Sequence, residues 1–330
     1  MILGSGRAPG KVILFGEHAV VYGRPALAVP VTQVQAEAVV ERGEIGAGLT
    51  IVAADLGETI AVRNAPIDNP LAAAARLTLV KFGLSDPDWR VTVRSTIPIA
   101  SGMGSGAAVS AAVVRALAVA RGQGSGVRGQ EVAISYQLSA ISPEEVSALV
   151  YEVERLHHGT PSGIDNTVVV YGQPVYFVRG QPPQTFRIGQ PFMLAIADTG
   201  IHSPTKVAVG DVRRAWEREG TRFESLFNRI AMVVETARSA IAAGEPERLG
   251  PLMDENHALL QEIGVSCPEL DALVTAALSA GALGAKLSGA GRGGNMIALV
   301  TEATASQVAD ALRAAGAVNV IVSIVRTGDI

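Results

Sequence analysis

A loop rich in glycine and serine runs directly into a stretch of small residues, and no other feature constrains the chain as strongly. Residues 98–112 read PIASGMGSGAAVSAA. The glycines at 102, 104 and 106 can adopt backbone angles closed to other residues, so main-chain N–H groups can approach an anion. The alanine-rich stretch that follows favours a helix, whose first turn would aim unpaired N–H groups into the loop. This junction predicts a site for a triphosphate.

A tight turn before a buried helix would leave the same pattern, so the loop alone does not decide the function. It lacks the lysine and the spacing of the G-x-x-x-x-G-K-[ST] loop. No strand followed by G-x-G-x-x-G and a helix is evident either. Two common nucleotide-binding folds are therefore not supported, and the choice depends on residues elsewhere in the chain.

The length of 330 residues allows two globular domains, and 48% hydrophobic with 18% charged residues is enough to give each a core. The sequence changes character at residues 179–191, where RGQPPQTFRIGQP separates two apolar stretches. We therefore predict an N-terminal domain over residues 1–187 and a C-terminal domain over residues 188–330.

The charge pattern argues against a polyanionic partner, because the net charge is −4 and the basic residues are dispersed. Neither nucleic acid nor an anionic membrane surface is expected to bind. The apolar stretch 106–120 is short for a membrane span and contains Arg115, so it predicts a core helix. Cys267 is the only cysteine, which excludes an internal disulfide and a cysteine metal cluster. With no secretory signal visible, we expect a cytoplasmic protein.

Apolar periodicity, glycine punctuation and helix-capping patterns predict a chain of mixed strands and helices. In the first domain they predict strands at 11–15, 90–97 and 168–171, and helices at 71–82, 106–120 and 142–157. In the second domain they predict strands at 193–197, 296–300 and 318–325, and helices at 207–219, 223–243, 246–264, 270–280 and 305–315. The glycine loop thus joins a strand to a helix.

Charged residues stand at the ends of two of these elements. Lys11 opens the first predicted strand, and Glu17 and His18 follow its end. Asp165 lies in a turn-rich loop at the head of the predicted strand 168–171. Each residue could instead have a structural role. Lys11 could be a solvated strand end, His18 a structural histidine, and Asp165 part of an Asx turn.

Three segments resemble the motifs of the GHMP kinase superfamily and follow the same order. They are APGKVILFGEH at 8–18, PIASGMGSGAA at 98–108 and KLSGAGRGG at 286–294. Within the superfamily the similarity is strongest to the mevalonate kinase family. Its N-terminal signature is similar to residues 9–23, and its catalytic segment is similar to ERLHHGTPSGID at 154–165. The resemblance covers nearly the whole chain.

This resemblance implies an α+β fold, with an N-terminal domain like the second domain of ribosomal protein S5 and a ferredoxin-like C-terminal domain. It implies transfer of the ATP γ-phosphoryl group to the C5 hydroxyl of mevalonate with Mg²⁺, in isoprenoid precursor biosynthesis, by a homodimer. Phosphomevalonate kinase is the nearest alternative, but no Lys or Arg cluster for a second phosphate is evident near the matched segments. A catalytically inactive, ligand-sensing member of the superfamily is a further alternative. The presence of Lys11, Glu154 and Asp165 argues against it.

The resemblance also assigns site residues. Asp165 would be the base beside the attacking hydroxyl, and Lys11 would neighbour both. Nucleotide binding is assigned to Pro98, Ala100, Ser101, Gly102, Met103, Gly104, Ser105 and Gly106. Substrate contacts are assigned to Glu17, His18, Ser203 and Thr205. The metal would be held by Glu154 and Ser105.

The chain departs from the family pattern in both glycine loops. Met103 replaces a leucine, and Gly106 replaces a serine whose hydroxyl reaches the metal, so we expect a weaker metal site with water in that place. Arg292 and Asn295 stand where the family usually has Gly and Cys. We expect the second loop still to support the first loop and the nucleotide.

Overall fold

The computed structural model of the chain describes residues 1–98, 101–123, 141–158, 161–202 and 205–327. These residues form two compact units. The first unit contains Met1–Gly10, Val34–Pro98 and Gly104–Tyr171, and the second contains the other described residues. Segments of the two units alternate along the sequence, and the division into domains 1–187 and 188–330 stays a prediction.

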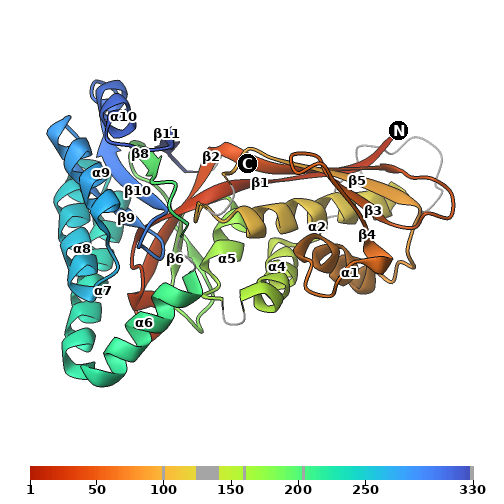
Figure 1. The fold of residues 1–330 in the computed structure, drawn as a ribbon, viewed down its shortest axis with the longest axis horizontal. Coiled ribbons are helices and arrows are strands. Elements are labelled where there is room, and N and C mark those ends of the chain that lie inside the picture. The colour runs from red at the N-terminus through yellow and green to blue at the C-terminus, as the bar shows by residue number, and fades with distance from the viewer. Residues whose placement is uncertain (99–100, 124–140, 159–160, 203–204, 328–330) are drawn as a thin grey trace. The chain divides into compact units, whose positions relative to one another are not determined.

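The first unit combines a small sheet with a group of helices (Figure 1). Its strands are β3 (Thr50–Ala53), β4 (Glu58–Ala61), β5 (Trp89–Ser95) and parts of β1 (Ile2–Phe15) and β2 (Ala26–Arg42). β5 pairs antiparallel with β2 and parallel with β3, and β3 pairs antiparallel with β4. Its helical segments are η2 (Val62–Asn64), α1 (Pro70–Phe82), α2 (Ser105–Gln123), α4 (Pro143–His158) and α5 (Ile164–Tyr171). The α-helices pack against one another, and α2 also contacts β5.

Two glycines bring β1 into backbone contact with α2. A Cβ on Gly4 would lie 2.4 Å from the carbonyl oxygen of Ala116, and one on Gly6 would lie 2.3 Å from that of Ala112. Both alanines are fully buried, so the predicted core helix is confirmed. Among the described residues, α2 is the one helix long and apolar enough to cross a membrane, but 61% of that stretch is buried inside the structure.

Local capping contacts fix the ends of two predicted helices. At the end of α1, Gly83 adopts a φ of 63°, as expected for a helix-ending glycine. Before α4, the N–H of Glu145 donates to the hydroxyl of Ser142, and the N–H of Ser142 donates to the carboxylate of Glu145. This reciprocal capping box confirms the predicted start of the helix.

The predicted strand at 168–171 is wrong, because these residues form the end of helix α5. The β-branched valines at 168, 169 and 170 favour a strand as isolated residues, yet all three are buried where α5 packs against α2 and α4. Tertiary burial on every side thus outweighs local propensity. As a consequence, Asp165 lies in the first turn of a helix, where the dipole favours a carboxylate.

The second unit is built on a four-stranded antiparallel sheet in the order β11-β8-β10-β9 (Figure 1). Its strands are β8 (Phe192–Asp198), β9 (Gly284–Ser288), β10 (Asn295–Val300) and β11 (Asn319–Val325). Its α-helices are α6 (Thr205–Arg218), α7 (Gly220–Ala243), α8 (Leu249–Ile263), α9 (Pro268–Ser279) and α10 (Ala305–Ala314). Every element predicted between residues 193 and 325 is therefore confirmed, with shifts only at the ends.

Smaller elements complete the second unit. They are η1 (Ala19–Tyr22), β6 (Val175–Phe177), β7 (Gln184–Thr185) and η3 (Pro246–Arg248). β6 pairs with the first residues of β2 and with β7. Helix α8 lies very close to β9, because a Cβ on Gly284 would come within 2.1 Å of the carbonyl oxygen of Gly250. The resulting architecture is mixed α and β, as predicted.

Candidate active site

The first part of the glycine loop is held by backbone and side-chain contacts within the second unit. The N–H of Lys11 on β1 donates to the carbonyl oxygen of Met103 at 3.0 Å. The amide nitrogen of Asn295, at the start of β10, donates to the carbonyl oxygen of Ser101. Gly102 has a φ of 80°, a conformation that glycine adopts without strain. The second glycine segment thus supports the first through Asn295, as the sequence predicts.

The other part of the loop belongs to the first unit, where Ser105 begins α2. A Cβ added to Gly106 would lie 3.4 Å from a carboxylate oxygen of Glu154 on α4. Glu154 is only 8% exposed. The position that lacks the family's serine therefore adjoins the glutamate predicted to bind the metal, although the two are distant in sequence.

Several other predicted residues lie apart from these contacts or outside the described residues. Asp165 is half-buried in the first unit, whereas Lys11 is buried in the second unit, so their juxtaposition stays a prediction. Thr205 is the first residue of α6 and is exposed. Ala100 and Ser203 lie outside the described residues.

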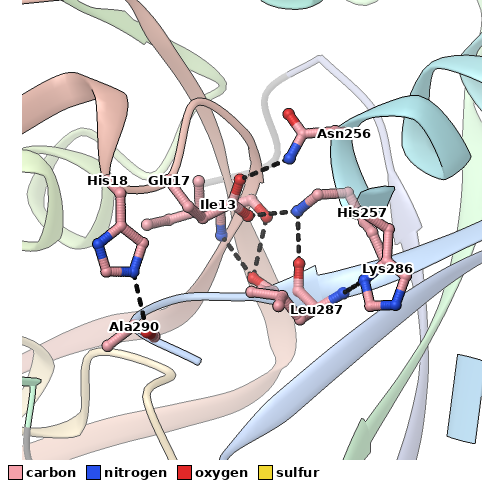
Figure 2. A network of polar contacts seen from close by, with 9 residues as sticks. Ile13, Glu17, His18, Asn256, His257, Lys286, Leu287 and Ala290 are labelled. Carbon is pink, nitrogen blue, oxygen red and sulfur yellow. Dashed lines mark hydrogen bonds and ion pairs between the residues drawn. The ribbon is translucent and has the colours of Figure 1, made fainter. Parts of the chain in front are cut away.

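Glu17 is part of a buried polar network in the second unit (Figure 2). One carboxylate oxygen pairs with the ammonium of Lys286, and the other accepts a hydrogen bond of 3.4 Å from the amide of Asn256. Lys286 also donates to the carbonyl oxygen of Leu287 at 2.5 Å. Both oxygens of Glu17 are thus engaged by protein groups, and its contact with a substrate stays a prediction.

Burial dominates the electrostatics of this pair. It raises the pKa of the Glu17 carboxyl, and it lowers the pKa of the Lys286 ammonium. The opposite charge of each partner counters both shifts, since the two side chains are 0% exposed and in direct contact. Neither charge is tolerated in this place without the other.

His18 carries a neutral ring held in one tautomer. Its Nε2 lies 2.9 Å from the carbonyl oxygen of Ala290 (Figure 2), which accepts a proton but cannot donate one. Burial, helped by the charge of Arg292 and opposed by the hydrogen bond to Ala290, lowers the pKa of His18 to about 4. The proton therefore resides on Nε2, and Nδ1 is an acceptor. The backbone of His18 has a φ of 59°, which is unusual for a residue other than glycine.

His257 has a structural role between α8 and β9. Its Nδ1 accepts a hydrogen bond of 3.3 Å from the N–H of Leu287, and its Nε2 lies 3.1 Å from the carboxylate of Asp271. Burial lowers the pKa of His257, so this ring is neutral as well. A proton on Nδ1 would meet the N–H of Leu287, so protonation would break this hydrogen bond between α8 and β9.

The two neutral histidines predict a loss of stability in mild acid. A histidine whose folded pKa is depressed stabilises the fold fully above its unfolded pKa of 6.5, and that contribution is lost as the pH falls toward the folded pKa. For His18 the loss between pH 7 and pH 5 is about 2 kcal/mol. Urea unfolding of the wild type, His18→Asn and His257→Gln at both pH values measures this. Between pH 7 and pH 5, each variant should lose less stability than the wild type. A variant that loses as much as the wild type would contradict the assignment of a neutral ring at its position.

Two functional candidates carry little or no signal in the sequence. Nothing marks Asn256, which lies within an ordinary amphipathic helix pattern. Lys286 opens the motif KLSGAGRGG, and that position is the one hint of a role. Among the described residues, no three His, Cys, Asp or Glu side chains gather as a metal site would require. A metal held by one carboxylate together with substrate phosphates would leave no such cluster.

Comparison with known proteins supports the family resemblance over nearly the full chain. The family model for the GHMP kinases N terminal domain matches residues 69–173, and the GHMP kinases C terminal model matches residues 237–318. The mevalonate kinase of Pyrococcus furiosus is 35% identical over 97% of this chain and 96% of its own length. That of Thermococcus sibiricus is 36% identical, with the same coverage of both chains.

A solved structure agrees with these sequence relatives. The crystal structure of L. major mevalonate kinase in complex with R-mevalonate is 30% identical to this chain and has a TM-score of 0.82. The similarity covers 99% of this chain and 97% of that one. Motifs, fold and full-length relatives therefore lead to one conclusion: the chain belongs to the GHMP kinase family.

Proposed function

We propose that this chain transfers the γ-phosphoryl group of ATP to the C5 hydroxyl of mevalonate. The observation that carries the proposal is the similarity, over nearly the whole chain, to proteins that are mevalonate kinases. Those relatives favour mevalonate over phosphomevalonate as the acceptor. The sequence agrees, because no cluster of basic residues for a second phosphate accompanies the matched motifs.

In this proposal Asp165 accepts the proton of the C5 hydroxyl, and Lys11 stabilises the alkoxide that develops. Phosphoryl transfer through a loose transition state requires mainly alignment and neutralisation of charge from the protein. A lysine and an aspartate about 4 Å apart attract by about 4 kcal/mol at an effective dielectric constant of about 20. Such a pair would hold the carboxylate beside the acceptor hydroxyl, so we assign the two residues equal importance.

The nucleotide is assigned to the glycine loop and the start of α2, whose free N–H groups suit its phosphates. Glu154 fits a magnesium site, because it is a buried carboxylate beside the first turn of that helix. Ser105 is the second proposed ligand. When bound, Mg²⁺ would neutralise charge on the phosphates. Neutral His18 would offer Nδ1 as an acceptor to a substrate hydroxyl, and Thr205 would offer its own hydroxyl.

Restoring the family's serine at position 106 should strengthen the proposed metal site. A side chain there starts 3.4 Å from the carboxylate of Glu154, so a serine hydroxyl can join it in holding Mg²⁺. We expect Gly106→Ser to lower the Mg²⁺ concentration that gives half-maximal activity by about two- to tenfold, the worth of one hydrogen-bonding ligand. Gly106→Ala is the matched control without a hydroxyl. Equal Mg²⁺ titrations for the wild type and Gly106→Ser would count against a ligand role at this position.

Release of ADP over a small substrate panel tests the proposed reaction. The panel contains mevalonate, phosphomevalonate, galactose and homoserine, each with ATP and Mg²⁺. We expect release of ADP with mevalonate and with none of the other three acceptors. ADP with phosphomevalonate instead would assign the chain to another GHMP kinase, and no ADP with any acceptor would favour a ligand-sensing member of the family.

We extend the proposal to the setting in which the enzyme works. The single cysteine suits a reducing cytoplasm, and the family resemblance suggests a homodimer. Light scattering of the purified chain measures its mass directly. A mass close to the 34.0 kDa of one chain at micromolar concentration would remove the dimer from the proposal.

A further inference from the structure

Arg292 occupies a backbone conformation that suits glycine. Its φ is 59°, between Gly291 at 77° and Gly293 at 129°. A residue with a Cβ is strained in this region, whereas glycine is not. Such strain persists where the side chain makes contacts that offset it. The contacts of the Arg292 side chain therefore deserve a functional explanation.

The arginine joins its loop to two helices within the second unit. One guanidinium nitrogen pairs with carboxylate oxygen Oδ2 of Asp211 on α6, and another lies 3.4 Å from the carbonyl oxygen of Gly264, which follows α8. The backbone N–H of Arg292 donates to the carbonyl oxygen of Val265 at 2.8 Å. The second carboxylate oxygen of Asp211 pairs with Arg214, which belongs to α6 itself. Arg292 thus supplies the link from Asp211 to the loop.

Among the residues that the structure describes, few others anchor the N-terminal end of helix α6. Thr205, Lys206 and Val207 form its first turn and are all exposed. Ala208 and Val212 are the buried residues of this helix, which packs against α7. With so little apolar burial, the placement of the first turn depends strongly on the polar contact one turn further along, at Asp211.

We propose that Arg292 is a positioning residue that holds α6, and with it Thr205, in register with the loop that contacts His18. The inference rests on the proposed function, in which Thr205 and His18 bind mevalonate. The same loop already contacts His18, because Ala290 accepts its Nε2 proton. The charge of Arg292 also contributes to the low pKa of His18, which is consistent with a short separation. Without the link, binding of mevalonate would have to order α6 and would be weaker.

Arg292→Gly is the direct test, because glycine fits the backbone and removes only the side chain. We expect the KM for mevalonate to rise about five- to tenfold, as for loss of one ordinary hydrogen bond, because the ion pair with Asp211 is partly exposed. The kcat and the KM for ATP should stay within about twofold of wild type. The lost contact would weaken mevalonate binding equally in the ground state and the transition state, which raises KM without lowering kcat. Asp211→Asn should give the same KM, the double variant should add nothing, and Arg292→Lys should recover part of the loss.

Arg214→Gln is the matched control. Arg214 also pairs with Asp211, but both residues lie on α6, so this ion pair does not join the helix to another element. This control should leave the KM for mevalonate unchanged. Amide hydrogen exchange in α6 of the ligand-free protein gives a readout independent of substrate identity: Arg292→Gly should accelerate it, and Arg214→Gln should not. Equal KM values for wild type and Arg292→Gly would overturn the proposal, as would equal effects of the two arginine variants. If α6 exchange responds as expected but mevalonate is no substrate, the proposed function fails and the link stands.

Discussion

Lys11→Met and Asp165→Asn should each remove nearly all turnover, by about 100-fold to 10,000-fold, while ATP binding stays close to wild type. Both residues are assigned to the acceptor hydroxyl, and neither is assigned to the nucleotide. Methionine fills the buried site of Lys11 with a side chain of similar length, and asparagine preserves the shape of aspartate. The loss should therefore appear in kcat. Steady-state ADP release and equilibrium titration with a nucleotide analogue measure the two quantities separately.

Arg7→Met is the matched control for Lys11, because Arg7 lies on the same strand, is 65% exposed and pairs with Glu37. It should change kcat by no more than about twofold, as for an exposed ion pair. Activity within about tenfold of wild type for Lys11→Met or Asp165→Asn would refute the role of that residue. A parallel loss of ATP affinity would instead indicate that the nucleotide site has been disturbed.

Local signals in the sequence explain most of the fold that could be predicted. The capping box of Ser142 and Glu145 needs only residues three apart, and the helix-ending role of Gly83 needs only its own backbone freedom. Both predictions are confirmed. The strand predicted at 168–171 is wrong because valine propensity is local, whereas the packing of α5 against α2 and α4 is not. Elements buried on all sides lose the periodicity that distinguishes a helix from a strand.

Some features of the candidate site could likewise be predicted from local sequence, whereas others depend on tertiary packing. The glycine loop is predictable, because phosphate requires main-chain N–H groups and glycine leaves them accessible. The proximity of position 106 to Glu154 comes from the packing of α2 against α4, which no spacing in the sequence encodes. Lys286 and Glu17 are 269 positions apart, and both could be solvated charges as far as local pattern is concerned. Only the tertiary structure reveals them as a buried pair.

That pair leads to the largest expected effect on stability. Glu17→Gln leaves the ammonium of Lys286 buried without a counter-charge, and Lys286→Met leaves the carboxylate of Glu17 in the same state. Breaking one side of a buried ion pair costs about 3–5 kcal/mol. Urea unfolding at pH 7 should show this loss for each single variant. Glu245→Gln, which breaks an ion pair whose side chains are 58% and 45% exposed, should cost less than about 1 kcal/mol.

The double variant Glu17→Gln, Lys286→Met distinguishes charge burial from simple loss of packing. If the unpaired charge is the cause, removing both charges should cost clearly less than the sum of the two single variants. The pH dependence gives a second signature. In Glu17→Gln, the depressed pKa of Lys286 means that the folded protein prefers the neutral amine, so the deficit should shrink as the pH rises toward 10.5. Additive losses with no such recovery would mean that the network around Glu17 stabilises the fold by packing, and that the pairing of its two charges contributes little.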